Sequence, residues 1–508
     1  MYSSVKSASV YGIEARIINV EADVSDGLPV FNMVGYLASE VREARDRVKT
    51  ALKNSNFALK PKHITVNLSP ADIRKAGTAF DLPIAIACLA ASEFIPEEKL
   101  NNVLIVGELG LDGKINRING VLPVCIAARD EGYGCVMVPR ENAGEGAVVK
   151  GIKVLGVSHI LDVIEYFLGV RDIEPVCFDP ETVLSEEISA PKEDFSDIYG
   201  QAAAKRAAEI AVAGQHNIIF SGPPGSGKTM LAKRIPGIMP DMTFEECLEI
   251  SRIYSVAGLL NEDTFLITRR PFRSPHHTCT TTSLVGGGVT PKPGEISLAV
   301  NGVLFLDEMP EFGRETIEAL RQPLEDRKVT VSRLNATYTY PAGFMLVASM
   351  NPCPCGHYPD RTRCSCTERQ IIQYRRRISQ PIMDRIDICV SVDAIKYREL
   401  EGGSVNESSA EIRRRVMKAR GIQLERYKGT GINFNSQLTG KQIGGFCTLG
   451  NEEKILMERA FQKYGLSARG YHRVLKVART IADLEGESTI KCEHLMEALC
   501  YRNQENAG

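Results

Sequence analysis

A glycine-rich stretch at residues 222–229 has the residue types and spacing that bind a phosphate group. It matches G-x-x-x-x-G-K-[ST] at every fixed position, between a short apolar run at 217–221 and a helical pattern from 230 onward. A strand, a glycine-rich turn and a helix N-terminus in this order direct backbone N–H groups at phosphate oxygens. A glycine-rich turn without a ligand is the alternative. The predicted nucleotide-binding residues are Gly222, Pro223, Pro224, Gly225, Ser226, Gly227, Lys228 and Thr229.

Two of these side chains and two acids downstream predict hydrolysis as well as binding. Lys228 can reach the β- and γ-phosphates, and the Thr229 hydroxyl can bind Mg²⁺. An apolar run at 303–306 ends in two carboxylates, of which Asp307 would hold the magnesium shell and Glu308 would activate the attacking water. A strand that ends in acids by chance is the alternative. ATP and Mg²⁺ are therefore the expected cofactors.

A third apolar run, at 344–350, ends in Asn351. It resembles sensor 1 of the AAA+ ATPases, in which a polar amide positions the water opposite the γ-phosphate. We therefore expect Asn351 to act in catalysis beside Glu308. The successive buried runs imply an α/β fold with a doubly wound parallel sheet, whose active residues lie at the carboxyl ends of the strands.

Two arginines would complete the site from a distance. The segment Met-Asp-Arg-Ile-Asp at 383–387 resembles an arginine-finger motif, so Arg385 would reach into the ATP site of a neighbouring copy and require an oligomer. Ser-Ala-Arg at 467–469 resembles sensor 2, and Arg469 would touch the nucleotide. Arg473 is the competing candidate, because it lies one helical turn along the same face. Surface salt bridges are the alternative for all three.

Composition sets broad limits on the chain. Its 508 residues suggest about three domains. Hydrophobic residues make up 44% and charged residues 24%, which is typical of globular proteins that work in water. A net charge of −2 excludes a uniformly basic nucleic-acid binder but not a local basic surface. The sequence shows no signal peptide and no apolar run of ~20 residues, so we expect a cytoplasmic protein without a membrane partner.

The pattern of the chain predicts four parts. Residues 1–168 form an α/β domain with helical patterns at 40–54, 81–91 and 122–131 and an apolar strand at 9–20. A proline-rich, acidic linker follows at 169–196. The ATPase core then spans 197–395, and a helix-rich lid spans 396–508.

The N-terminal part resembles a known fold. Lys-Ala-Gly at 75–77, Asp-Leu-Pro at 81–83 and Asn-Gly-Val-Leu-Pro at 119–123 resemble the ribosomal-protein-S5-like fold shared with the proteolytic domain of Lon and the C-terminal domain of RadA. In Lon this fold carries a Ser–Lys dyad. The matching positions here are Lys75 and Leu122, which cannot perform that chemistry. We therefore expect a non-proteolytic domain for scaffolding, subunit contact or DNA contact.

A block between the phosphate loop and Asp307, at 269–299, resembles the helix-2 insert region of the magnesium-chelatase-like ATPases. Together with the N-terminal domain, the cysteine segment described below and the lid, the chain is similar to the YifB/ComM family of bacterial magnesium-chelatase-like proteins. That resemblance implies a hexameric ATP-driven motor that migrates DNA branches in natural transformation. The rival functions are an ATPase that remodels a partner protein, and an ATP-dependent protease, against which Lys75 and Leu122 argue.

Two basic segments could contact DNA phosphates. The first is the proline-interrupted stretch 269–278, and the second is a predicted hairpin at 326–338, just before Asn351. Arginines that pair with acids at a subunit interface are the alternative. Adjacent His276 and His277 are weak candidates for metal ligands. The DNA-contact candidates are Arg269, Arg270, Arg273, Lys328 and Arg333.

Four of the 14 cysteines lie within fourteen residues of one another, at 353–366. In a cytoplasmic protein such a cluster suggests a structural zinc site rather than disulfides. His357 could replace one cysteine, and a turn-rich loop with reduced thiols is the alternative. The candidate zinc ligands are Cys353, Cys355, Cys364 and Cys366.

Overall fold

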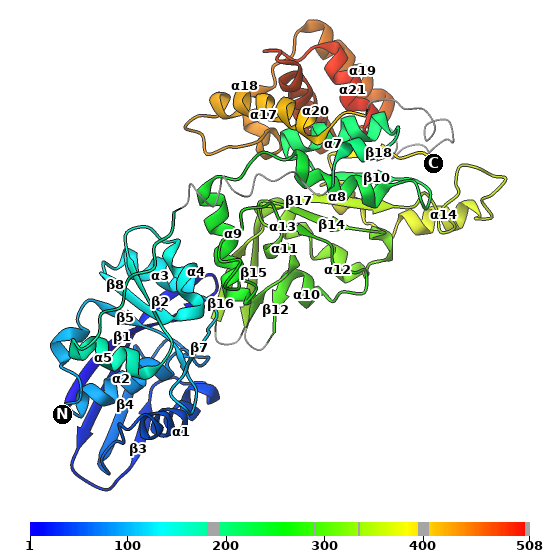
Figure 1. The fold of residues 1–508 in the computed structure, drawn as a ribbon. Helices are drawn as coiled ribbons and strands as arrows, with labels where there is room; N and C mark the ends of the chain where they lie inside the picture. Colours follow the sequence, from blue (N-terminus) through cyan, green and yellow to red (C-terminus); the bar gives the residue numbers. More distant parts are fainter. Residues whose placement is uncertain (180–192, 289–290, 334–335, 395–405, 503–508) are drawn as a thin grey trace. The chain divides into compact units, whose positions relative to one another are not determined.

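The computed structural model describes residues 1–179, 193–288, 291–333, 336–394 and 406–502, and the chain forms two compact units (Figure 1). The first unit contains Met1–Ile188 and Thr243–Thr268, and the second contains Ser189–Met242 and Arg269–Gly508. The sequence-based boundaries kept 243–268 inside the ATPase core, whereas this segment folds with the N-terminal residues. Among the described residues, no helix is both long enough and apolar enough to cross a membrane.

A seven-stranded mixed sheet in the order β3-β4-β2-β1-β5-β8-β9 forms the first unit. Its strands are β1 (Tyr2–Tyr11), β2 (Glu14–Ser25), β3 (Phe31–Val34), β4 (His63–Ser69), β5 (Val103–Ile105), β8 (Cys135–Pro139) and β9 (Lys153–Val157). A two-stranded ribbon, β6 (Glu108–Leu109) and β7 (Ile115–Asn116), stands beside it. The predicted strand at 9–20 is in fact two antiparallel strands, because Gly12 takes a positive φ of 66° and turns the chain.

The helices of the first unit cover this sheet. They are α1 (Ser39–Asn54), α2 (Asp81–Ala91), α3 (Val121–Asp130), α4 (Ala143–Ala147), α5 (Ile160–Leu168) and α9 (Phe244–Ala257). Every residue of α2 is buried, and this helix packs against β1 and β2. Helix α9 packs on α3, and the backbone N–H of Gly120 donates to the Ser255 carbonyl over 3.1 Å. This contact explains why 243–268 belongs to the first unit.

The second unit contains a five-stranded, all-parallel sheet in the order β11-β14-β17-β10-β18. Its strands are β10 (Ile218–Ser221), β11 (Phe272–Arg273), β14 (Val303–Leu306), β17 (Met345–Met350) and β18 (Ile388–Ser391). The two neighbours of β10 both come later in the chain, so the strand order reverses there. Ligands of open parallel sheets bind at such a switch point, outside the carboxyl ends of the strands.

Short elements connect these strands. The helices are α7 (Ala202–Gly214), α8 (Lys228–Ile238), α10 (Thr281–Val285), α11 (Glu295–Leu298), α12 (Arg314–Glu318), α13 (Arg321–Asp326), α14 (Glu368–Arg375) and α15 (Gln380–Met383). The ribbons are β12 (Gly286–Gly287) with β13 (Lys292–Pro293), and β15 (Lys328–Arg333) with β16 (Ala336–Pro341). The second ribbon is the hairpin that the sequence predicted before Asn351.

Helices end the chain. They are α17 (Ser409–Arg426), α18 (Gly440–Phe446), α19 (Asn451–Tyr464), α20 (Ala468–Glu485) and α21 (Cys492–Cys500). Helix α17 packs on α7 and α8, and α20 packs on α7. Their apolar residues therefore share one hydrophobic core with the parallel sheet.

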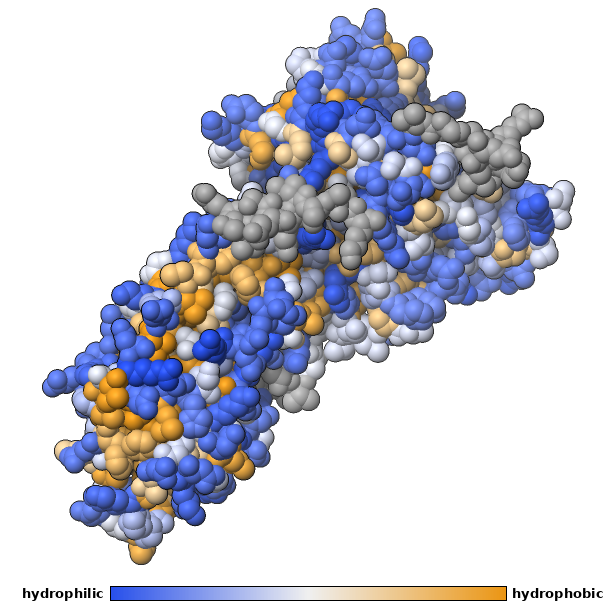
Figure 2. Space-filling view, in the orientation of Figure 1, coloured by the Kyte–Doolittle hydropathy of each residue, from blue (hydrophilic) through white to orange (hydrophobic). Residues whose placement is uncertain are grey.

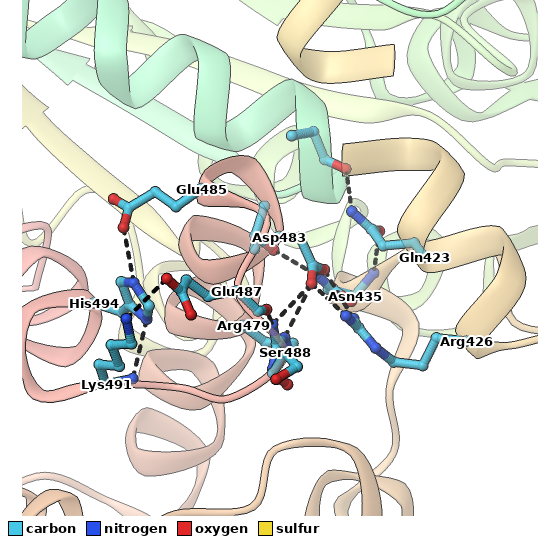
Figure 3. Close-up of polar contacts among 12 residues, drawn as sticks. Gln423, Arg426, Asn435, Arg479, Asp483, Glu485, Glu487, Ser488, Lys491 and His494 are labelled. Carbon is cyan, nitrogen blue, oxygen red and sulfur yellow. Dashed lines mark hydrogen bonds and ion pairs between the residues drawn. The ribbon is translucent and has the colours of Figure 1, made fainter. Parts of the chain in front are cut away.

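Buried polar contacts join the same helices (Figure 3). The buried Asp483 carboxylate accepts hydrogen bonds from Arg426 and Arg479 and, over 2.9 Å, from Asn435 Nδ2. Gln423 Nε2 donates to the Ala213 carbonyl over 2.9 Å and so ties α17 to the end of α7. No short sequence pattern reveals this network, because its members come from four separate segments.

We expect Asp483→Ala to destabilise the second unit by about 3–5 kcal/mol, because two guanidinium groups lose a buried counter-charge. Thermal unfolding of the full chain, followed by circular dichroism, measures the effect. Glu458→Ala is the matched control, since it removes an exposed carboxylate from α19 and should change stability by less than about 0.5 kcal/mol. Equal melting temperatures for both variants would contradict the role given to Asp483.

Candidate nucleotide-binding and hydrolysis site

The phosphate loop follows β10 directly. The buried strand β10 ends at Ser221, and α8 begins at Lys228. A Cβ at Gly222 would lie 2.1 Å from the Val392 carbonyl oxygen, so only glycine fits there. Gly225 and Gly227 adopt positive φ angles of 76° and 90°, which side chains disfavour. The local geometry is therefore the strand, glycine-rich turn and helix order that the sequence predicted.

The Lys228 ammonium lies inside this loop. Its Nζ donates to the carbonyls of Gly222 (2.7 Å) and Pro223 (2.8 Å) and to Asn351 Oδ1 (3.2 Å). Burial lowers the pKa of Lys228, while the carboxylates of Asp307 and Glu308 act to raise it. Lys228 is thus the point at which several elements meet. These are the loop after β10, the ends of β14 and β17, and the first residue of α8.

The candidate magnesium ligands lie side by side. Thr229 Oγ1 donates to Asp307 Oδ2 over 2.9 Å. Two neighbouring ligands of an octahedral Mg²⁺ with bonds of about 2.1 Å are about 3.0 Å apart, so this pair fits the ion. Ser349 Oγ donates to Asp307 Oδ1 over 2.5 Å and accepts from the Glu308 backbone N–H over 2.9 Å.

The sequence analysis did not select Ser349. It is a polar residue within the apolar run at 344–350, and the parallel pairing of Leu306 with Ala348 brings it beside Asp307. A serine inside a strand that is buried on both faces is the signal that could have identified it, because a buried hydroxyl needs a partner.

Glu308 has an unusual backbone conformation. Its φ is 51°, in the left-handed region that non-glycine residues rarely occupy, and its side chain is exposed. The turn that follows is closed by a 2.8 Å hydrogen bond from the Glu311 N–H to the Glu308 carbonyl. The chain therefore bends sharply after β14, which separates the Glu308 carboxylate from the buried strand. Strained residues of this kind cluster at functional sites.

Tyr374, on α14, is a second residue that the sequence analysis missed. Its buried hydroxyl lies at the backbone N–H of Asn351, near the carboxylates of Glu311 and Glu308. Burial raises the pKa of Tyr374 to about 12, so the phenol keeps its proton. Tyr374 is therefore a neutral polar group next to the candidate sensor Asn351.

Arg385 lies away from the phosphate loop of its own chain. Its Nη1 donates to the Pro381 carbonyl over 2.6 Å, and its Nη2 pairs with the Glu325 carboxylate. This guanidinium holds the pKa of Glu325 below its usual value, and Arg469 adds to the effect. Among the described residues, the side-chain hydrogen bonds and ion pairs of Arg385 are these two. The polypeptide is anchored there by Asn217, whose Nδ2 donates to the Arg385 carbonyl over 2.8 Å.

The two sensor-2 candidates have different surroundings. Arg473 is buried, and its Nη1 donates to the carbonyls of Met383 (3.3 Å) and Ile386 (3.4 Å). It also lies within 4 Å of the carboxylates of Asp384 and Asp387. Arg469 is exposed at the start of α20. Arg473 therefore supports the segment that carries Arg385, whereas Arg469 is exposed near Glu325.

The basic candidates for DNA contact also differ from one another. Arg270 donates to the backbone carbonyls of Pro240, Asn301 and Asp241 at 2.6–3.3 Å. Arg273 forms a bidentate pair with Glu295 at 2.6 and 2.8 Å. Both guanidinium groups thus have partners within this chain, and only Arg273 pairs with an acid.

The remaining candidates are Arg269, Lys328 and Arg333. Arg269 and Lys328 are exposed, and Arg333 ends strand β15. The rings of His276 and His277 are 4.1 Å apart, and His276 Nδ1 bonds to the Thr278 hydroxyl. Among the described residues, the groups that could hold a metal ion include neither histidine.

The four cysteines of the 353–366 segment converge, as their spacing predicted. The Sγ atoms of Cys353, Cys355, Cys364 and Cys366 all lie within 4.8 Å of one another. His357 is exposed and is not part of this group.

The positions that match the Lon dyad are part of the core of the first unit. Lys75 is buried and donates to the Pro70 carbonyl. Leu122 is buried on α3, where its N–H donates to Glu145 Oε1 over 2.9 Å. Neither position supplies a nucleophile or a base to the surface.

The fold and site define an ATPase of the magnesium-chelatase type. Residues 194–400 match the family model described as "Magnesium chelatase, subunit ChlI", residues 20–142 match "Subunit ChlI of Mg-chelatase", and residues 406–502 match "Magnesium chelatase, subunit ChlI C-terminal". This family is built on the AAA+ ATPase, which uses ATP and Mg²⁺.

Similar proteins narrow the class to one family. The chain is 44% identical to "Competence protein ComM" of Haemophilus influenzae over 98% of this chain and 97% of that protein. It is 42% identical to "Uncharacterized protein YifB" of Escherichia coli over 98% of this chain and 97% of that protein. A shorter match, 29% identical over 32% of this chain and 35% of the other, is to "DNA repair protein RadA" of Halalkalibacterium halodurans. The chain therefore belongs to the YifB/ComM family of magnesium-chelatase-like ATPases.

Proposed function

We propose that this chain is the subunit of a hexameric ring motor that hydrolyses ATP and moves along DNA to promote branch migration or unwinding. The observation that carries the proposal is the meeting of Lys228, Thr229, Asp307 and Asn351 at the carboxyl edge of the sheet. This arrangement supports ATP hydrolysis. The DNA substrate is supported by the printed names of two relatives, a competence protein and a DNA repair protein.

Each residue of the site has a role in the proposed reaction. The backbone of residues 222–227 holds the β-phosphate, and Lys228 neutralises the γ-phosphate. Thr229 and Asp307 would hold Mg²⁺, which would supply positive charge to stabilise the phosphates. Glu308 takes a proton from the attacking water, and Asn351 orients that water.

Arg385 and Arg469 are the residues from which we propose a ring of several subunits. Arg385 pairs with Glu325 on a partly exposed surface and contacts no residue of its own phosphate loop among those described. A guanidinium in this place could stabilise the transition state of hydrolysis in an adjacent subunit. Arg385 would then leave Glu325 and contact the nucleotide of that subunit. Arg469 lies near the same carboxylate and would contact the nucleotide from the lid, to which we assign residues 406–502.

Arg269, Lys328 and Arg333 are the residues that we propose contact DNA. Lys328 and Arg333 mark the two ends of strand β15, on a hairpin that immediately precedes the strand of Asn351. A shift of β17 during hydrolysis would therefore move the hairpin as well, because the two are adjacent in the chain. We do not include Arg270 and Arg273 among the DNA contacts. Backbone carbonyls bind the guanidinium of Arg270, and Glu295 pairs with that of Arg273.

The first unit has surface suited to contact with another subunit. Figure 2 shows hydrophobic patches on its visible face, and its exposed large apolar residues include Val34 in the edge strand β3 and Leu28 and Val30 just before that strand. We propose that this domain provides scaffolding or subunit contacts. Proteolysis is not proposed, because Lys75 and Leu122 occupy the positions of the Lon dyad.

DNA should stimulate the ATPase. We expect branched or single-stranded DNA to raise the rate of ATP hydrolysis severalfold, with an effect that weakens as salt increases because phosphate contacts release counterions. Steady-state phosphate release, measured with a panel of DNA structures, tests this. Lys328→Ala should reduce the stimulation without changing the basal rate. An ATPase that ignores DNA and responds to a partner protein would favour the remodelling function instead.

A further inference from the structure

We propose that Cys353, Cys355, Cys364 and Cys366 bind one Zn²⁺ ion, and that this ion holds their loop against the phosphate loop so that nucleotide affinity depends on the metal. The four cysteines by themselves form the metal site. Its consequence for nucleotide rests on the proposed function, and the experiment below separates the two.

The sulfur atoms have the spacing of ligands to a single ion. Cys353 Sγ lies 3.4 Å from Cys355 Sγ and 3.7 Å from Cys364 Sγ, and the Cys355–Cys364 distance is 3.6 Å. Four thiolates around a tetrahedral Zn²⁺, with bonds of about 2.3 Å, are about 3.8 Å apart. The sulfurs are too far apart for disulfides. They are too close together to enclose an iron–sulfur cluster, which brings sulfides of its own.

Cys353 Sγ also accepts a backbone N–H group, that of Tyr358, over 3.4 Å. Such hydrogen bonds stabilise the negative charge of a thiolate and fix its direction, as is usual around structural metal sites. One of the four candidate ligands thus has direct backbone support.

Few apolar side chains hold this loop in place. Residues 353–367 form turns and irregular backbone without a helix or strand, and the core beneath them consists of Cys353, Cys364 and Ile371, with Tyr358 packed against it. Ordering a residue costs about 1–2 kcal/mol of conformational entropy, which so small an apolar cluster cannot offset for fifteen residues. Metal binding commonly supplies the missing free energy in such segments.

One glycine connects the cysteine loop to the phosphate loop. Gly356 lies between two ligands in sequence and has a φ of +82°. A Cβ at this position would come within 2.5 Å of Pro224 Cδ, so the bare glycine backbone lies directly on the phosphate loop. Asn351 precedes Cys353 by two residues, so the loop leads directly from the candidate sensor. The metal would therefore fix both sides of the site.

The first experiment measures metal in the purified full-length protein. We expect about one zinc per chain by inductively coupled plasma mass spectrometry. Cys364→Ser should lose it, whereas Cys500→Ser, which changes an exposed cysteine on α21, should keep it. Protein that contains no zinc and takes up none when zinc is added, or that contains iron instead, would overturn the assignment.

The second experiment measures binding of a fluorescent ATP analogue to the same proteins. We expect the affinity to fall at least about tenfold on loss of zinc, and to recover when zinc is restored to the wild type. Gly356→Ala should keep its zinc and still lose affinity, because the methyl group displaces Pro224. Gly343→Ala is the control, since a Cβ there meets no atom within 4 Å.

The two measurements fail in different ways. Suppose that the wild type contains zinc, and that Gly356→Ala and protein stripped of zinc both bind nucleotide with unchanged affinity. That result would overturn the coupling but leave the metal site in place. A wild type that holds zinc but binds no nucleotide would instead refute the proposed function. The Gly356 variant keeps the test valid even if loss of a cysteine prevents folding.

Discussion

Replacing Arg385 with alanine is expected to lower the rate of ATP hydrolysis by about 10³-fold or more, which is the scale of an arginine finger, while ATP still binds. The guanidinium would be lost from the transition state, but the phosphate loop of the same chain contacts neither Arg385 nor its partner Glu325 among the described residues. Single-turnover hydrolysis and nucleotide affinity measure the two effects separately. Arg459→Ala, which removes an exposed arginine from α19, is the control.

Mixing two inactive variants tests whether Arg385 acts between subunits. Lys228→Ala removes the phosphate contact but keeps the finger, whereas Arg385→Ala has the opposite defect. In a mixed ring, some interfaces join an intact site to an intact finger, so hydrolysis should partly recover. An Arg385 variant with normal turnover, or a mixture that stays inactive although it assembles, would contradict a finger that acts in trans.

Glu308→Gln is expected to reduce hydrolysis by about 10²–10⁴-fold, which is the contribution of a general base. The amide keeps the shape of the side chain but cannot accept the proton of water. Mg²⁺ and ATP should remain bound, because Thr229, Asp307 and Lys228 are unchanged. The substitution should therefore trap the ATP-bound oligomer, which gel filtration with light scattering can detect.

Glu315→Gln provides the control for Glu308. It changes an exposed carboxylate on α12 to the same amide within the same connection after β14. We expect its turnover to match the wild type. A Glu308→Gln protein that hydrolyses ATP at the normal rate would exclude Glu308 as the base and direct attention to Glu311, the acid that follows three residues later in the same turn.

The sequence by itself determined the parts of the site whose geometry is local. The phosphate loop needs only a strand, glycines and a helix start in succession, and these are adjacent in the chain. Asp307, Glu308 and Asn351 end apolar runs that could only be buried strands, and parallel strands bring such ends to one edge of the sheet. The cysteine spacing likewise brings four thiols into one loop.

Only the tertiary structure decided the contacts between distant segments. A serine inside a buried strand signals that Ser349 needs a partner, but only strand register shows that the partner is Asp307, and only helix packing brings Tyr374 to the site. Arg473 is distinguished from Arg469 by burial under the segment of Arg385. The structure also assigns Arg273 to Glu295, and it places 243–268 with the first unit. Local motifs fix the identity of the chemical groups, whereas long-range packing fixes which of them are free to act.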